Sequence, residues 1–168
     1  MALLFPRPGE LRFAHWPEFD LTKGIWSISA EHTKMRRAHR SPLPRQAIEV
    51  LTALKAVRLT EGLVFHSVRT VREPLSENTF NAALRRLGYG TDEMTAHGFR
   101  ATASTLLNES GKWNADAIER QLAHVEGSDV RRAYARGEHW AERVRMMQAW
   151  ADYLDELKAG KPVAISAE

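Results

Sequence analysis

The 168-residue sequence contains no cysteine, which excludes a disulfide scaffold, thiol catalysis and any zinc site built on thiolates. It has no hydrophobic run long enough to span a membrane, and its apolar opening, residues 1–5, lacks the layout of a signal peptide. Seven prolines and ten glycines are too few for a disordered or collagen-like chain. These absences leave a soluble, intracellular globular protein with no membrane partner.

What is present is enough for one globular domain. Hydrophobic residues make up 43% of the chain and charged residues 27%, and this length and composition support a single core. Lys and Arg number 24 against 21 Asp and Glu, which gives a net charge of only +3. That balance permits an anionic partner but does not identify one.

The pattern of apolar residues predicts a mainly helical α+β domain with a small antiparallel sheet near the N-terminus. Residues 25–29 alternate apolar and polar side chains as a half-buried strand does, and residues 40–43 provide the return strand. Residues 33–45 carry five cations and no acid, which predicts a basic hairpin between these strands. Apolar spacing and capping residues predict helices at about 7–15, 44–57, 76–88, 95–110, 114–124, from Ser128 past Tyr134, and 139–158.

Two pairs of polar residues stand one helical turn apart. His97 and Arg100 would project from one face at the start of a helix, where anions are favoured. Arg7 and Glu10 have the same spacing. Considered singly, the first pair is a capping histidine beside a surface arginine, and the second is a surface ion pair contributing at most about 1 kcal/mol.

Three further side chains could have a role in binding or catalysis, and each also has an ordinary structural explanation. Lys34 stands at the predicted hairpin tip. Its charge is either simply solvated or in contact with a phosphate group. His124 closes a helix, where a protonated histidine is favoured by the dipole alone. Tyr134, among arginines, is either a stacked surface ring or a nucleophile whose phenolate the neighbouring cations stabilise.

The order of these residues resembles the tyrosine recombinases, most closely the integrases of prophages and genomic islands. The resemblance rests on RPGEL at residues 7–11, KMRR at 34–37, TAHGFRAT at 95–102, QLAH at 121–124 and RRAY at 131–134. It spans about residues 3–158, which is nearly the whole chain. Several motifs in the family's order over a whole domain are far more specific than any one of them.

The resemblance implies site-specific DNA recombination through a 3′-phosphotyrosine intermediate, with a role for each matched residue. Arg7 and Arg100 match the arginines that hold the scissile phosphate, and Tyr134 matches the nucleophile. The other matches are Lys34 as general acid to the 5′-oxygen, His97 in proton transfer with the tyrosine, His124 as a phosphate donor, and Glu10 as a support of the pocket. Because transesterification conserves the phosphodiester energy, no cofactor and no metal are expected.

The resemblance also implies partners and a location. The expected partners are double-stranded DNA at attachment sites, such as the ends of tRNA genes, and sister protomers in a tetrameric synapse. The expected location is the bacterial cytoplasm, on the nucleoid. The arginines expected to bind DNA are Arg36, Arg37, Arg40, Arg131 and Arg132.

Family members carry a core-binding and often an arm-binding domain before the first arginine. Because Arg7 stands near the start, we expect a catalytic domain over residues 1–160 without those domains, followed by a tail at 161–168. Two alternatives use the same residues: DNA relaxation as in related topoisomerases, and a truncated remnant that binds DNA without cutting. A metal-dependent hydrolase built on His97, His124 and His139 is disfavoured because these histidines lack close ligand spacing.

Overall fold

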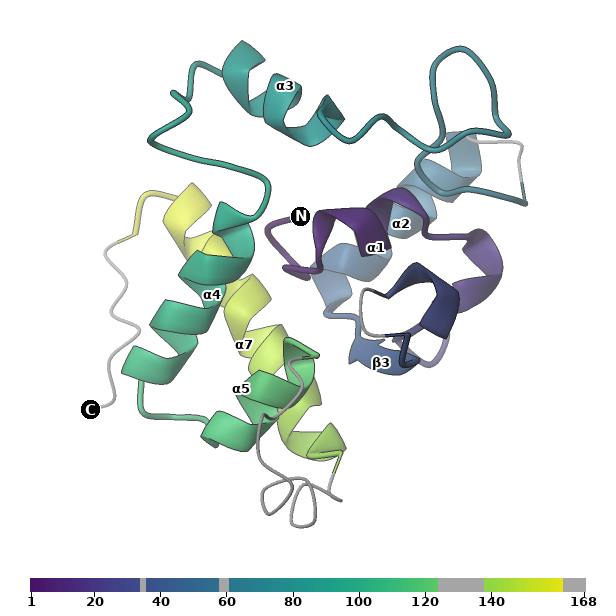
Figure 1. The fold of residues 1–168 in the computed structure, drawn as a ribbon. Helices are drawn as coiled ribbons and strands as arrows, with labels where there is room; N and C mark the ends of the chain where they lie inside the picture. The colour runs from purple at the N-terminus through teal and green to yellow at the C-terminus, as the bar shows by residue number, and fades with distance from the viewer. Residues whose placement is uncertain (34–35, 58–60, 124–137, 162–168) are drawn as a thin grey trace.

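The computed structural model describes residues 1–33, 36–57, 61–123 and 138–161, in which six α-helices accompany a three-stranded sheet (Figure 1). The helices are α1 (Pro8–Arg12), α2 (Arg45–Val57), α3 (Thr79–Arg86), α4 (Gly98–Glu109), α5 (Ala115–Gln121) and α7 (Trp140–Lys158). The strands are β1 (Phe19–Asp20), β2 (Ile25–Ile28) and β3 (His39–Pro42), with 3₁₀ turns η1 (Trp16–Glu18) and η2 (Ala30–His32). The predicted α+β class, mainly helical, is confirmed.

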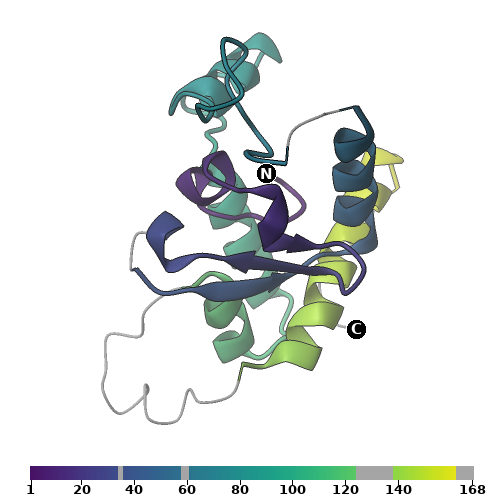
Figure 2. The same ribbon diagram turned by 90° about the vertical axis from the view of Figure 1, so that its right-hand side faces the viewer.

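The sheet is antiparallel, in the order β1-β2-β3, and contains the predicted basic hairpin. In its register Trp26 lies opposite Ser41 and Ile28 opposite His39. Trp26 and Ile28 are buried while Ser27 is exposed, as the alternation predicts. Figure 2 shows the two long strands side by side, with α4 and α5 behind them and α2 and α7 to their right.

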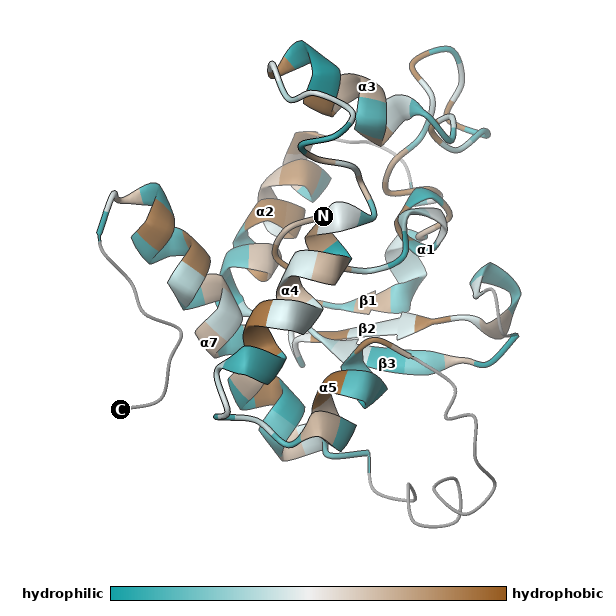
Figure 3. Cartoon of the chain, turned by 60° about the vertical axis from the view of Figure 1, so that its left-hand side comes forward, coloured by the Kyte–Doolittle hydropathy of each residue, from teal (hydrophilic) through white to brown (hydrophobic). Residues whose placement is uncertain are grey.

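Two hydrophobic clusters form the interior instead of the single core expected. One lies between the sheet, α1 and α2, around Trp26 and Leu51. The other joins α4, α5 and α7, whose brown faces meet in Figure 3, and includes Phe5 packed edge-on against Trp150. Leu4 packs against both clusters, so the N-terminal segment connects them.

Helix α1 is shorter than predicted because the chain after it pairs with a distant segment. The backbone N–H of Val64 donates to the Ala14 carbonyl at 2.9 Å, and that of Trp16 to the Gly62 carbonyl at 3.0 Å. These bonds confirm the extended piece predicted at residues 63–65, and they end the helix at Arg12 instead of His15. In the described part of the chain, no helix is both long enough and apolar enough to cross a bilayer.

Candidate functional site

Arg7 is fixed by its own helix. It precedes α1 in an extended conformation, and Pro8 provides the first helical residue. The Glu10 carboxylate accepts hydrogen bonds from the backbone N–H of Arg7 and from its Nη1, each at 2.9 Å. Glu10 is only 2% exposed, so this pair is not the solvated surface contact that its spacing alone favours.

Arg100 lies in the first turn of α4 and is 4% exposed. Its guanidinium donates to the Phe5 carbonyl at 3.3 Å and to the carbonyl of Leu122. Arg7 donates through Nη2 to the next carbonyl along the chain, that of Ala123, at 3.0 Å. The structure therefore brings the two arginines, 93 positions apart, to the same end of α5, where α1 and α4 also begin.

The guanidiniums of Arg7 and Arg100 lie at this end of α5 together with the buried Glu10 carboxylate. The pKa of Arg100 is lowered to about 10, chiefly by burial and then by the charge of Arg7, against the opposing effect of Glu10 and Glu119. Arg100 is thus still charged at neutral pH. Two positively charged guanidiniums beside one carboxylate attract an anion, and forked donors match the oxygens of phosphate.

His97 is the residue that caps α4, one turn before Arg100. Its ring is exposed and makes no hydrogen bond to any residue in the described ranges. It is therefore available to a ligand that approaches the start of α4, where the helix dipole favours negative charge.

Five of the predicted residues lie outside the described ranges: Lys34, His124, Arg131, Arg132 and Tyr134. Of the other arginines expected to bind DNA, Arg36 and Arg37 are exposed. Arg40 is half-exposed, pairs with the Glu138 carboxylate and places its guanidinium carbon 4.9 Å from the Trp140 ring centroid.

Among the residues that the structure describes, four other than glycine have positive φ angles: Phe5, Arg36, Ala123 and His139. The carbonyls of Phe5 and Ala123 accept the hydrogen bonds from Arg100 and Arg7. A side chain disfavours this left-handed backbone, and such residues concentrate at functional sites, where the surroundings enforce them. The strain supports the assignment of the site to this end of α5.

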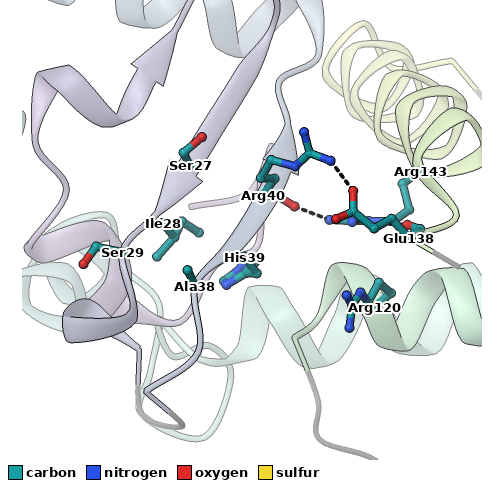
Figure 4. Close-up of a pocket in the computed structure, with 9 residues that line it drawn as sticks. All are labelled: Ser27, Ile28, Ser29, Ala38, His39, Arg40, Arg120, Glu138 and Arg143. Carbon is teal, nitrogen blue, oxygen red and sulfur yellow. Dashed lines mark hydrogen bonds and ion pairs between the residues drawn. The ribbon is translucent and has the colours of Figure 1, made fainter. Parts of the chain in front are cut away.

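A cavity of about 260 Å³ lies between the β2–β3 hairpin and the helices α5 and α7 (Figure 4). The residues that line it are Ser27, Ile28, Ser29, Ala38, His39, Arg40, Arg120, Glu138 and Arg143. Of these residues, only Arg40 is predicted from the sequence to bind DNA. Three arginines against one glutamate make the cavity positively charged.

Arg143 of α7 is the buried member of this set, at 2% exposure. Its Nε and Nη2 donate to the Gln121 side-chain carbonyl at 3.0 and 2.8 Å, and Nη2 also donates to the Arg40 carbonyl. Gln121 in turn donates to the Ser41 hydroxyl at 2.8 Å. This network ties β3, α5 and α7 together around the cavity.

Replacing Arg143 with Leu should lower the free energy of unfolding by about 2–4 kcal/mol, because it leaves the Gln121 and Arg40 carbonyl oxygens buried and unpaired. Urea denaturation measures this change. Arg145→Leu is the matched control, because Arg145 lies on the exposed face of the same helix and should cost less than about 0.5 kcal/mol. Equal losses in the two variants would contradict the stabilising role of the network.

His39 begins β3 beside the same groups. Its Nδ1 is buried and has no hydrogen-bond partner in the described part of the chain. The pKa of His39 is lowered from 6.5 to about 4, chiefly by burial; Glu10 opposes this shift, and Arg143, Arg7 and Arg100 add to it. The imidazole is therefore neutral at neutral pH.

This neutral histidine predicts a loss of stability in acid. Between pH 6.5 and 4 the unfolded chain takes up a proton at His39 that the folded chain does not, so folding stability should fall as the pH is lowered through this range. Denaturant midpoints measured across the range should decline less for His39→Gln than for the original protein. The exposed His97→Gln variant is the control, and a parallel decline in all three proteins would exclude His39 as the source.

Three potential metal ligands lie together where η1 and η2 meet. His15, Glu18 and His32 place ligand atoms within 4.8 Å of one another. Glu18 already accepts from His32 Nδ1 at 2.9 Å and from Trp26 Nε1 at 3.1 Å, and the two imidazoles stack at 5.5 Å. These contacts explain the cluster as a polar connection between η1 and η2.

Comparison with known proteins gives the same assignment as the motifs. Residues 5–139 match the phage integrase family. The integrase of Enterobacteria phage P4 is 46% identical over 167 residues, which cover 91% of this chain and 38% of that protein. Prophage integrase IntA of Escherichia coli (strain K12) is 39% identical over 161 residues, which cover 96% of this chain and 38% of the relative. The chain therefore spans about two fifths of the length of these relatives.

Two solved structures have the same fold. An integrase from mycobacterium phage Brujita superposes with a TM-score of 0.64 at 17% identity, over 88% of this chain and 47% of the other. The XerA recombinase gives a TM-score of 0.60, also at 17% identity, over 96% of this chain and 54% of the other. The expected tyrosine-recombinase fold is confirmed. With the family match extending over most of its residues, the chain belongs to the phage integrase family.

Proposed function

We propose that this chain carries the catalytic site for site-specific DNA recombination, in which strands are cut and rejoined through a 3′-phosphotyrosine. The observation that supports it best is the convergence of Arg7 and Arg100, with buried Glu10, at the end of α5. The P4 and IntA relatives carry the name integrase, which supports the same reaction.

In the proposed cleavage step, the phenolic oxygen of Tyr134 attacks the scissile phosphorus while the bond from phosphorus to the 5′-oxygen breaks. Arg7, Arg100 and His124 bind the non-bridging oxygens and stabilise the additional negative charge of the transition state. Lys34 gives a proton to the departing 5′-oxygen, and His97 takes part in the proton transfer of the phenol.

Rejoining reverses these steps with a different strand. The free 5′-hydroxyl of a partner strand attacks the phosphotyrosine, forms the new phosphodiester and releases the Tyr134 phenol. The number of phosphoester bonds is unchanged, so the sequence of steps needs neither ATP nor a redox partner.

The proposal extends to partners and domain organisation. Residues 1–160 form the catalytic unit, with residues 161–168 as a tail, and double-stranded DNA at attachment sites is the substrate. Strand exchange takes place between sister protomers in a synapse. Glu10 supports the site through Arg7, because its carboxylate holds both the backbone and the guanidinium of that residue.

Covalent trapping tests this function without knowledge of the attachment site. The protein is incubated in EDTA with a pool of nicked duplexes of randomised sequence, in which cleavage releases a short fragment and leaves the adduct trapped. DNA attached to the peptide that contains Tyr134 is the expected result. Attachment at another residue, or an adduct that needs a divalent metal, would overturn the proposal; DNA binding without any adduct would identify a non-cleaving remnant.

A further inference from the structure

We propose that His39 and Arg120 form a second phosphate subsite, which binds a DNA backbone phosphate next to the one held by Arg7 and Arg100. This inference rests on the proposed function, since it assumes DNA in the site. It adds two residues that the family motifs do not contain, one from β3 and one from the last turn of α5.

The first support is the set of free donors in the cavity. Both residues line the same cavity of about 260 Å³ (Figure 4). The other two lining arginines are occupied: Arg40 by the Glu138 carboxylate, and Arg143 by Gln121 and backbone carbonyls. The side chain of Arg120 has no hydrogen bond or ion pair to any residue in the described ranges, so its guanidinium is available to a ligand.

The second support is the position of the His39 ring. Because Nδ1 is enclosed by protein without a partner, Nε2 is the nitrogen left to meet a ligand in the cavity. A neutral imidazole with Nδ1 unprotonated carries its proton on Nε2 and is a hydrogen-bond donor there. A phosphate oxygen accepts such a bond, and a neutral donor adds no charge to a site that already holds several cations.

The third support is the charge around the ring. Arg7, Arg100 and Arg143 all act on His39 electrostatically, and Glu10 is the carboxylate that opposes them. Within the cavity the lining cations are Arg40, Arg120 and Arg143, against Glu138, whose carboxylate Arg40 already holds. The cavity therefore offers a net positive charge to an anion, next to the two arginines of the main site.

Methylphosphonate interference tests the subsite by DNA binding alone. Each phosphate of a bound duplex is replaced in turn by a neutral methylphosphonate, and the affinity is measured. In the original protein we expect a loss of about tenfold at one phosphate besides the scissile one. In Arg120→Ala, and separately in His39→Leu, the same methylphosphonate should lower the affinity for DNA by less than about twofold, because the protein has already lost its contact with that phosphate.

His39→Gln is the matched control, since the glutamine amide keeps an N–H donor at a similar distance from the backbone and should restore part of the interference. Arg120→Ala should also reduce the slope of log affinity against log salt by about one. Arg120 is exposed, so this variant decides the question even if His39→Leu fails to fold. An interference pattern unchanged in Arg120→Ala would overturn the subsite while leaving the phosphotyrosine proposal intact; loss of the scissile-phosphate signal in the original protein would instead overturn the proposed function.

Discussion

Replacing Tyr134 with Phe should abolish the covalent protein–DNA adduct and leave DNA affinity within about twofold of the original. The phenolic oxygen is the atom that bonds to phosphorus in the proposed reaction, and phenylalanine lacks only that atom. The ring remains, so any stacking among Arg131, Arg132 and Arg136 is kept. Trapping on a nicked duplex, run beside a salt-titrated binding assay, measures both quantities.

Tyr89→Phe is the control for this substitution. Tyr89 is half-exposed, lies just after α3, and stands outside all the motifs of the site, so its hydroxyl should not affect adduct formation. An adduct that survives in Tyr134→Phe would assign the nucleophile to another residue. A parallel fall of binding and cleavage would mean that Tyr134 acts in binding instead of bond formation.

The sequence predicts the parts of this fold that depend on neighbouring residues. Alternation in residues 25–29 predicts β2 to within one residue, and Asn114 caps α5 as expected, accepting from the Asp116 N–H at 2.9 Å. The final helix begins and ends where its pattern indicates. In each case the signal and the structure lie within one element.

Burial in α7 shows where this reasoning fails. Apolar spacing predicts that Val144 faces the core, yet Val144 is 43% exposed and its neighbour Arg143 is buried. The helix turns its arginine inward because Gln121 and the Arg40 carbonyl, both distant in sequence, offer it acceptors. No local pattern contains those partners, so the same reasoning missed Arg143, His39 and Arg120.

The candidate site was predicted from the order of the sequence motifs along the chain, not from the periodicity of apolar residues. Singly, Arg7 with Glu10 indicates a solvated pair, and only the succession of motifs indicates a shared pocket. The structure supplies what the motifs lack: a buried Glu10 and a common end of α5 for Arg7 and Arg100. It also shows that both arginines already donate to backbone carbonyls, so in the proposed reaction phosphate would share or replace those bonds.

Replacing Arg100 with Ala should lower the rate of adduct formation by about 10³-fold, or about 4 kcal/mol of transition-state stabilisation, as for the loss of a preorganised donor to a developing negative charge. The loss of rate should exceed the loss of affinity for uncleaved DNA, because the charge on the non-bridging oxygens increases only as Tyr134 attacks. Single-turnover cleavage, with binding measured separately, distinguishes the two effects.

Arg100 also donates to the carbonyls of Phe5 and Leu122, so alanine will destabilise the fold as well. Arg100→Lys separates these effects: lysine keeps a positive charge near the pocket but cannot bind two oxygens with a planar fork. If the fork matters, the lysine variant should remain slow, at least about tenfold below the original, at temperatures where its melting curve shows it fully folded. Near-normal cleavage by Arg100→Lys would reduce the role of this residue to a buried positive charge, and near-normal cleavage by Arg100→Ala would remove it from the site.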